Sequence, residues 1–282
     1  MEIKSLAKIE KSTIYKAFNQ AFEDYDVHIN ELELQKMLSR RGFNSELSFA
    51  IFEKNKIIAF TLNGIGIFNG KKTAYDTGTG TLKKYRGKGL ATKIFNYSIP
   101  YLKEKEVKQY LLEVLQHNEK AVSIYKKLDF TKSREFNYFI QKNINISIDI
   151  TNPNLFNIKH LNNNDLKLVH NFWDFNPSWQ NNFEAIYKNP KDFIFLGAFI
   201  NDKLKGYIIF EPLSGDISQL AVEKHHRRKG IASLLIKEVL KINENKEIKI
   251  INAETTCDSI TNFLKSKNIL LTGKQFEMIK IL

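Results

Sequence analysis

The sequence has a single cysteine, five prolines and two tryptophans among its 282 residues. The lone Cys257 excludes an intramolecular disulfide and a cysteine-based metal cluster, so we expect a reducing, cytoplasmic environment and no metal site. The longest strongly apolar run, Phe193 to Phe199, is much shorter than the roughly 20 residues that a membrane span needs. Residues Met1 to Lys11 carry charges without an apolar stretch, which is not the pattern of a secretory signal.

Composition and length favour a folded protein of about two domains. Hydrophobic residues make up 43% of the chain, an ordinary value for globular proteins. The net charge is +12, and residues 1–145 hold 25 Lys and Arg against 16 Asp and Glu, so most of the excess lies in the first half. A basic half can attract an acidic protein, a nucleic acid or a phosphorylated cofactor. Because the lysines are scattered and no nucleic-acid motif contains them, we do not expect nucleic-acid binding.

Two short segments repeat each other. Residues 80–91 read Gly-Thr-Leu-Lys-Lys-Tyr-Arg-Gly-Lys-Gly-Leu-Ala, and residues 220–232 read Leu-Ala-Val-Glu-Lys-His-His-Arg-Arg-Lys-Gly-Ile-Ala. Their arginines, Arg86 and Arg227, are separated by half the chain length, which is the spacing of a duplicated domain. We place the boundary between residues 146 and 147, within the asparagine-rich segment 143–154.

The flanks of the two segments predict the same order of elements. In the first half we expect helices over 12–22, 30–37 and 119–128, a helix after the motif, and strands over 47–52, 57–62, 109–115 and 134–141. Pro100 should kink the helix after the motif or end it early. In the second half we expect strands over 193–200, 204–210, 248–253 and 275–281, with helices over 232–242 and 258–265. The predicted fold class is therefore α/β: two lobes, each a mixed, mostly antiparallel sheet flanked by helices.

The repeated motif, Arg-x-x-Gly-x-Ala, has the chemistry of an anion site. Gly89 removes a side chain where the backbone would approach a ligand. The first-turn N–H groups of the following helix lack partners, and with the helix dipole they suit a pyrophosphate. Arg86 and Lys88 add positive charge around this site. The segment lacks the Gly-Lys-Ser/Thr ending of a triphosphate-binding loop and the Gly-x-Gly-x-x-Gly spacing of dinucleotide binders.

Both copies of the motif resemble the GNAT superfamily of acyl-CoA-dependent N-acyltransferases, whose motif reads Gln/Arg-x-x-Gly-x-Gly/Ala. The resemblance covers nearly the whole chain as two tandem lobes and implies acetyl-CoA as the acyl donor. Its pyrophosphate would be held by Arg86, Gly87, Lys88, Gly89, Leu90, Ala91 and Thr92. The resemblance also implies that Thr81 and Leu82 lie along the acetyl and pantetheine groups.

A second stretch, residues 112–130, strengthens the resemblance in the first half. Family members commonly read Glu-Val, then Asn-x-x-Ala-x-x-x-Tyr-x-x-x-Gly-Phe, and here Asp129 stands in place of the glycine. The resemblance implies that Asn118 contacts the pantetheine arm and that Tyr125 lies near the thioester sulfur. Glu113 and Tyr125, followed by Arg134, are similar to protein N-terminal alanine acetyltransferases, which suggests Glu113 as a base.

Acyl transfer to an amine needs the same roles on chemical grounds. A base must take a proton from the amine, and the departing thiolate needs a donor, which a phenol with a pKa of about 10 can be. A backbone N–H can stabilise the carbonyl oxygen. Three alternatives stay open: Tyr125 as a packing residue, Glu113 as a surface residue, and His117 as the base.

The second half differs at the positions that would carry catalysis. Cys257 falls near the position of Asn118. Either Phe263 or Leu264 falls at the position of Tyr125, and neither of these two side chains can donate a proton. We therefore expect residues 1–146 to form the catalytic lobe and residues 147–282 a lobe that is structural or regulatory. A buried, apolar role for Cys257 is the better interpretation.

The acceptor is predicted only by class. An acidic turn, Glu23, Asp24 and Asp26, lies beside Phe22 and Tyr25 and suits a cationic amine. The predicted activity is acetyl transfer directly to a primary amine, on a small molecule or on a peptide or protein, in a ternary complex. The alternatives are a protein N-terminal or lysine acetyltransferase and a non-catalytic CoA-binding regulatory module. We expect a monomer or a homodimer and no membrane partner.

Overall fold

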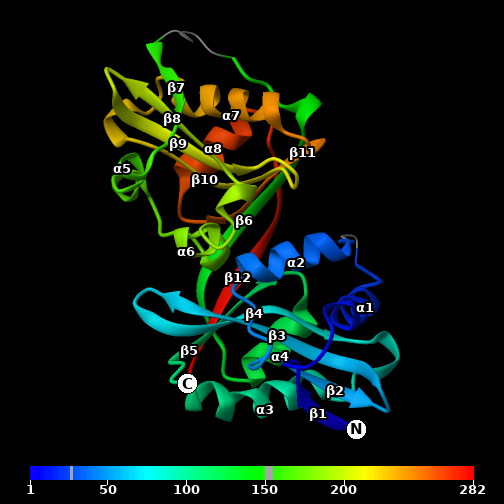
Figure 1. Ribbon diagram of the computed structural model, residues 1–282. Helices are drawn as coiled ribbons and strands as arrows, with labels where there is room; N and C mark the ends of the chain where they lie inside the picture. Colours follow the sequence, from blue (N-terminus) through cyan, green and yellow to red (C-terminus); the bar gives the residue numbers. More distant parts are fainter. Residues whose placement is uncertain (26–27, 150–154) are drawn as a thin grey trace. The chain divides into compact units, whose positions relative to one another are not determined.

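The computed structural model describes residues 1–25, 28–149 and 155–282. Asp26 of the predicted acidic turn and residues 150–154 of the predicted boundary segment lie outside this range. The chain forms two compact units (Figure 1). Unit 1 comprises Met1–Ser133, Phe183–Asn189 and Phe276–Leu282, and unit 2 comprises Arg134–Asn182 and Pro190–Gln275.

Unit 1 is built on a mixed sheet. Its strands are β1 (Glu2–Ser5), β2 (Phe49–Glu53), β3 (Lys56–Phe68), β4 (Lys71–Thr81) and β5 (Gln109–Leu115), followed by the ends of β12 (Leu271–Ile281) and β6 (Thr131–Lys142). Their order is β1-β2-β3-β4-β5-β12-β6. β1 to β4 pair antiparallel, and β4 pairs parallel with β5.

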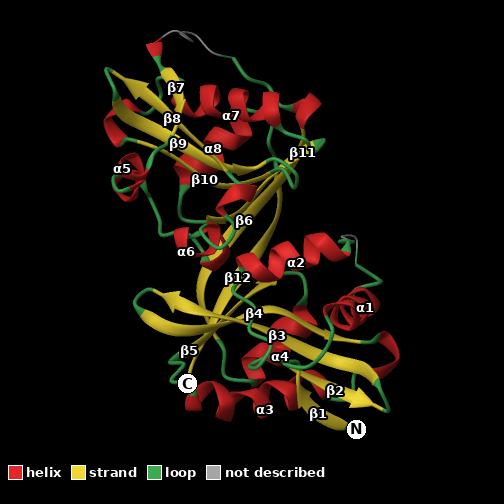
Figure 2. Ribbon diagram, in the orientation of Figure 1, coloured by secondary structure: helices red, strands yellow, loops and turns green. Residues whose placement is uncertain are grey.

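Four helices pack on this sheet. They are α1 (Lys11–Ala21), α2 (Glu31–Arg40), α3 (Leu90–Glu104) and α4 (Glu119–Lys127). Figure 2 shows α2 and α3 on opposite sides of the strands, and residues of α3 and α4 share one core cluster. A capping box starts α2, in which the Asn30 side chain accepts from the Glu33 N–H and the Glu33 carboxylate accepts from the Asn30 N–H. The short α6 (Phe183–Ile186) also belongs to unit 1.

Unit 2 repeats the plan. Its strands are β7 (Asn157–His160), β8 (Ile194–Ile200), β9 (Lys203–Glu211), β10 (Asp216–Val222) and β11 (Glu247–Glu254), followed by parts of β6 and β12. Their order is β7-β8-β9-β10-β11-β6-β12, and β10 pairs parallel with β11. The helices are α5 (Asn163–Leu166), α7 (Ile231–Ile242) and α8 (Asp258–Ser266). Residues Leu235, Ile236 and Val239 of α7 are fully buried in its core.

Strands β6 and β12 contribute to both units. In unit 1 the end of β12 lies between β5 and β6, and in unit 2 β6 lies between β11 and β12. Met278 of β12 is 1% exposed in the core of unit 1, and the Leu282 N–H donates to the Lys108 carbonyl at 3.0 Å. Each unit is therefore completed by a strand from the other half of the sequence.

The predicted fold class, two α/β lobes with mixed and mostly antiparallel sheets, is confirmed. Of the two effects expected of Pro100, a kink or an early end of the helix, the early end is wrong, since α3 continues through Pro100 to Glu104. Burial of Ile94, Phe95 and Leu102 on one face of α3 outweighs the hydrogen bond that proline removes. The four-residue strands β1 and β7 were not predicted, because half-exposed segments of that length carry little periodicity.

The parallel strands at the centre of each unit separate after a short contact. β4 and β5 pair only from Thr73 with Gln109 to Tyr75 with Leu111, and β10 and β11 pair only at Asp216 with Lys249. β4 also shifts register against β3 between Gly78 and Asp76. Beyond these points, no strand of the described residues pairs with one edge of β4 or with one edge of β10.

Candidate functional site

The loop before α3 exposes backbone N–H groups. Gly87 and Gly89 have φ of +76° and +69°, and a Cβ at either would meet no atom within 4 Å. The first intrahelical hydrogen bond runs from the Lys93 N–H to the Gly89 carbonyl at 3.0 Å. The N–H groups of residues 90–92 therefore have no acceptor within the helix. With the positive end of the helix dipole they form a site for an anion such as a pyrophosphate.

Arg86 holds the shape of this loop. Its guanidinium donates to the Thr81 carbonyl at 3.2 Å, to the Ala21 carbonyl at 2.8 Å, and to both oxygens of Asp24 at 2.5 and 2.7 Å. The hydrogen bonds from Arg86 lower the pKa of Asp24 to about 2. The guanidinium donors of Arg86 are thus directed at the protein. Lys88 supplies positive charge at the open side of the loop, where it is exposed and its Nζ lies 5.3 Å from the Tyr85 ring centroid.

Thr81 and Leu82 have different surroundings. The Leu82 N–H donates to the Ile58 carbonyl at 3.0 Å, and the Leu82 side chain is buried. Because N–H directions alternate along an antiparallel ladder, the Thr81 N–H points away from β3, toward the side from which β5 has separated. Of the two predicted residues, Thr81 is the one that offers a backbone donor there.

Asn118 and Tyr125 are positioned by α4. Asn118 caps the helix, accepting from the Ala121 N–H at 3.2 Å, and its side-chain amide lies 3.4 Å from the Tyr25 hydroxyl. Two turns later the Tyr125 hydroxyl donates to Asp76 Oδ2 at 3.2 Å. The Tyr125 ring packs against Phe95 and Phe130, with each pair of ring centroids 5.8 Å apart.

Asp76 is the site residue that the sequence reasoning missed. It directly follows Tyr75, the last residue of β4 paired with β5. Its carboxylate also accepts from the Gly78 N–H at 3.0 Å and from the Thr79 hydroxyl at 2.9 and 3.0 Å. Burial raises the pKa of Asp76 to about 6, although these donors lower it. The signal that the sequence offered for Asp76 was a single carboxylate in a strand that otherwise consists largely of small residues.

Glu113 is not brought to Tyr125. Successive residues of β5 alternate between faces, and the neighbours Leu112 and Val114 pack in the same core cluster as Tyr125. Glu113 therefore lies on the other face, where it forms a hydrogen bond with Tyr75; burial and this carboxylate together raise the pKa of the Tyr75 phenol well above its ordinary value. His117, the alternative base, is exposed.

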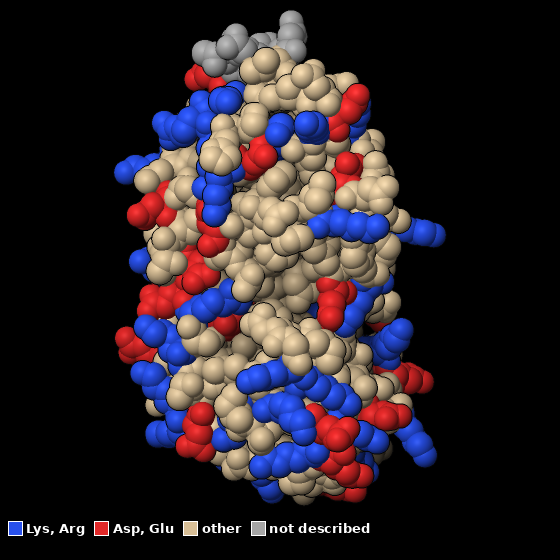
Figure 3. Space-filling model, turned by 90° about the vertical axis from the view of Figure 1, so that its left-hand side faces the viewer, with Lys and Arg blue, Asp and Glu red and all other residues tan. Residues whose placement is uncertain are grey.

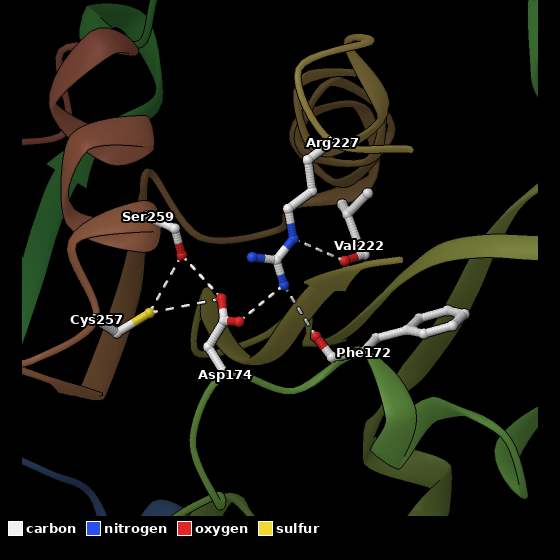
Figure 4. A network of polar contacts seen from close by, with 6 residues as sticks. All are labelled: Phe172, Asp174, Val222, Arg227, Cys257 and Ser259. Atoms are coloured by element: carbon white, nitrogen blue, oxygen red, sulfur yellow. Dashed lines mark hydrogen bonds and ion pairs between the residues drawn. The ribbon is translucent and has the colours of Figure 1, made fainter. Parts of the chain in front are cut away.

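Unit 2 repeats the loop almost contact for contact (Figure 4). Arg227 donates to the Val222 carbonyl at 3.1 Å, the Phe172 carbonyl at 3.3 Å and Asp174 at 2.9 Å. Gly230 has a φ of +86°, and the Leu234 N–H donates to its carbonyl at 2.9 Å, so α7 also begins with open N–H groups. One position differs, because Arg228 takes a φ of +63° where unit 1 has Gly87.

The start of α8 lacks the groups found at the start of α4. Cys257 stands at the cap position without a side-chain cap hydrogen bond, and it is buried as predicted. Its sulfur lies 3.2 Å from the Ser259 hydroxyl, which donates to Asp174 at 2.9 Å (Figure 4). Because α4 and α8 both have nine residues, Leu264 occupies the position of Tyr125, and it is fully buried.

A cavity of about 500 Å³ lies in unit 2 between the separated strands. Its walls include residues 217–222 of β10, residues 250–253 of β11 and the Arg227 loop. At the wall, Trp173 donates to the Tyr207 hydroxyl at 2.6 Å, and this hydroxyl donates to Gln219 at 2.7 Å. These contacts join neutral groups, whereas the corresponding part of unit 1 holds the Asp76 carboxylate.

Comparisons with known proteins cover both repeats. The family model described as the acetyltransferase (GNAT) family matches residues 11–130 and 158–261. N-alpha-acetyltransferase 30 of Schizosaccharomyces pombe is 28% identical over 97 residues, a match that covers 34% of this chain and 65% of that protein, slightly less than two thirds of its length.

Among solved structures, a tandem GNAT protein from the clavulanic acid biosynthesis pathway has a TM-score of 0.75 at 10% identity, covering 99% of this chain and 98% of its own. A GCN5-related N-acetyltransferase from Sphaerobacter thermophilus has a TM-score of 0.73 at 12% identity, covering 99% and 95%. At these identities the structures show a shared fold, in which two lobes follow each other. Since the family model matches both repeats, this chain belongs to the acetyltransferase (GNAT) family.

Proposed function

We propose that unit 1 transfers an acetyl group from acetyl-CoA directly to a primary amine in a ternary complex. The observation that carries the proposal is the position of the Tyr125 hydroxyl, bonded to Asp76 where β4 and β5 separate. The amide-lined start of α3 belongs to the same unit. Unit 2 has the equivalent loop and strands but a leucine in place of the tyrosine.

The residues present fit acetyl-CoA. The loop would hold the pyrophosphate on the N–H groups of residues 90–92, because Gly87 and Gly89 leave open the space that side chains would fill. Lys88 would add charge at the exposed side. Asn118 would meet the pantetheine arm, and the Thr81 N–H would donate to the thioester oxygen. Bound acetyl-CoA supplies the reactive thioester.

The proposed chemistry needs one proton acceptor and one donor. The amine nitrogen attacks the carbonyl carbon, its proton passes to a base, and the C–S bond breaks. Tyr125 gives its proton to the sulfur. Glu113 is the proposed base, acting directly or through water, because it lies on the opposite face of β5 from Tyr125, so that donor and acceptor would work from the two sides of the sheet.

Calorimetry with acetyl-CoA, combined with a thiol-release assay, tests this proposal. The acceptors are spermidine and a peptide with a free N-terminal amine. We expect acetyl-CoA to bind and Tyr125→Phe to lower turnover by about 100-fold or more with affinity within twofold. Phe263→Leu in the helix of unit 2 is the matched control and should leave turnover unchanged. Equal turnover in the wild type and Tyr125→Phe would remove Tyr125 from the mechanism.

The peptide N-terminal amine is the more specific candidate acceptor. It is favoured by the similarity to a protein named N-alpha-acetyltransferase, which covers about a third of this chain. Two peptides separate the two protein substrates: one with a free N-terminal amine and no lysine, and one with a blocked N-terminus and one internal lysine. Acetylation of only the first peptide would support N-terminal acetylation, and acetylation of only the second would support lysine acetylation.

The cavity of unit 2 favours a second candidate function, a CoA-binding regulatory module. It is bounded by the Arg227 loop and carries no proton donor at the position of Tyr125. Calorimetry distinguishes the cases, because two sites per chain with turnover would make unit 2 a regulatory site beside a catalytic one. Binding without turnover on any amine would support the regulatory module alone.

The remaining expectations concern partners and location. In the described residues no helix is long and apolar enough to cross a membrane. On the face shown in Figure 3, lysine and arginine side chains are interspersed with aspartate and glutamate. We propose a cytoplasmic protein, monomeric or homodimeric, that does not bind nucleic acid. A gel-filtration run with light scattering and a salt titration of RNA binding test these points.

A further inference from the structure

Asp76 is a partly buried carboxylate with an unusual set of neighbours. It accepts from a backbone N–H, from the Thr79 hydroxyl and from Tyr125. The Thr79 hydroxyl also lies 3.0 Å from the Thr61 hydroxyl, which in turn lies 3.3 Å from the Tyr110 hydroxyl. The carboxylate thus joins the α4 tyrosine to a line of hydroxyl groups inside the sheet. A carboxylate at the separation of β4 and β5 has a desolvation cost that an apolar residue there would avoid.

We propose that Asp76 is a positioning residue for the transfer: it holds the Tyr125 hydroxyl in place and, by gaining or losing a proton, determines whether that hydroxyl can donate to the leaving thiolate. This inference rests on the proposed function of unit 1 and extends it. It concerns a residue that acts through Tyr125 and does not require Asp76 to touch either substrate.

The two protonation states of Asp76 direct the Tyr125 proton differently. An ionised Asp76 accepts a hydrogen bond from the Tyr125 hydroxyl, and its negative charge disfavours a phenolate beside it. A protonated Asp76 donates to the Tyr125 oxygen instead, which turns the Tyr125 O–H toward another acceptor. The protonated form is therefore the one in which Tyr125 can act as a donor.

The transfer leaves the number of protons on Asp76 and Tyr125 unchanged. When the C–S bond breaks, the thiolate takes the Tyr125 proton and the resulting phenolate takes the proton of Asp76. The Asp76 carboxylate then takes up one proton, and the amine releases one proton when it forms the amide, so the two changes cancel. No oxidant, metal or further reactant is needed.

The groups that face Asp76 come from several elements. Tyr125 of α4 and Tyr110 of β5 have pKa values raised well above the ordinary value by burial and then by the Asp76 charge. Tyr75 precedes Asp76 on β4 and also feels its charge, and the Arg41 guanidinium lowers the pKa of Asp76. In the neutral range the carboxyl of Asp76 is thus the member of this set that changes charge.

Carbon-13 NMR of protein labelled at the aspartate carboxyl tests the pairing without any turnover. Asp76→Asn assigns the signal, and we expect its midpoint near pH 6. In Tyr125→Phe the midpoint should rise by several tenths of a unit or more, because a donor to the ionised form is lost. Tyr101→Phe, which changes an exposed tyrosine of α3, is the control and should leave the midpoint in place. An unchanged midpoint in Tyr125→Phe overturns the proposal.

The pH dependence of turnover tests the control of donation. The ratio of wild-type to Asp76→Asn turnover, measured with saturating acetyl-CoA from pH 5 to 8, removes the ionisation of the amine, which both proteins share. We expect this ratio to fall by about tenfold as the pH rises through the midpoint found by NMR. The wild type loses the donor to Tyr125 when Asp76 ionises, whereas asparagine keeps a donor at every pH. In the Tyr125→Phe background the same substitution should have no effect on turnover. A flat ratio overturns the proposal.

The two tests separate this inference from the proposed function. If acetyl-CoA does not bind or no amine is acetylated, the proposed function fails, and the NMR titration still decides whether Asp76 and Tyr125 form a coupled pair. If turnover depends on Tyr125 but neither the midpoint nor the ratio changes as stated, the proposed function stands and the role of Asp76 is refuted.

Discussion

The two units keep the same loop and differ at the helix after the separated strands. In both, an arginine ties the loop to an aspartate of the preceding segment, Arg86 to Asp24 and Arg227 to Asp174. At the following helix, Asn118 and Tyr125 of α4 are replaced by Cys257 and Leu264 of α8. The comparison teaches that the amide-lined loop can be retained while the asparagine and tyrosine proposed for acetyl transfer are replaced.

The groups near the separated strands also differ, although unit 2 buries a carboxylate of its own, Asp216, which accepts from the Ser218 hydroxyl at 2.8 Å. Unit 1 places the Asp76 carboxylate against Tyr125, and unit 2 places the neutral groups of Trp173, Tyr207 and Gln219 beside a cavity of about 500 Å³. A partly buried carboxylate with a pKa of about 6 can exchange a proton near neutral pH, whereas an amide, an indole and a phenol whose pKa is raised by burial cannot. The predictions below test how far this difference between the units holds.

The largest expected effect comes from placing a valine at the helix-start glycine of either unit. Gly89→Val should reduce turnover by about 100-fold or more, because a β-branched residue is strained at positive φ and would displace the open N–H groups. Gly230→Val should leave turnover within about threefold. The thiol-release assay measures both, and the reverse order would assign catalysis to unit 2.

The second prediction tests the shared strand β12. Met278→Ala should lower the free energy of unfolding by about 2 to 4 kcal/mol, because Met278 is 1% exposed in the core of unit 1. Ile281→Ala, at a residue that is 66% exposed, is the control and should have little effect. Urea unfolding measures both. A similar loss in the two variants would contradict the contribution of β12 to this core.

The third prediction concerns the charge of Asp76 and the stability of unit 1. Its folded pKa of about 6 lies above the ordinary 3.8, so its contribution is full below pH 4 and is lost as the pH rises through 6. The wild type should therefore lose roughly 1 to 3 kcal/mol relative to Asp76→Asn between pH 4 and 7. Urea unfolding at both pH values measures this, with the exposed Asp129→Asn as control. A constant difference between the proteins would mean that Asp76 does not titrate there.

The smallest expected effect concerns the loop position that differs between the units. Arg228→Gly should stabilise the protein by about 0.5 to 1 kcal/mol, since Arg228 has a φ of +63°. Gly87→Ala should destabilise it by a similar amount, because Gly87 has a φ of +76°. Thermal unfolding measures both changes. Effects of the same sign at the two positions would contradict the matching of these loops.

Much of this arrangement could be read from the sequence because it depends on local patterns. The repeat around Arg86 and Arg227, the helix that Asn118 caps and the strand over 109–115 all follow from neighbouring residues, and the structure contains each of them. The family motif pointed to Tyr125 in the same way, and its catalytic role stays a prediction. Asp76 was missed because nothing near it in the sequence reveals Tyr125, which follows 49 residues later.

The sequence by itself determined the duplication, the α/β class of each half and the glycines that open the loop, since these follow from periodicity and from backbone conformations that glycine favours. Only the tertiary structure decided that β6 and β12 complete both units, that the Arg86 guanidinium is directed at Asp24, and that Glu113 faces away from Tyr125. These features depend on contacts between distant segments, where strand order, register and burial select the partners that local sequence leaves open.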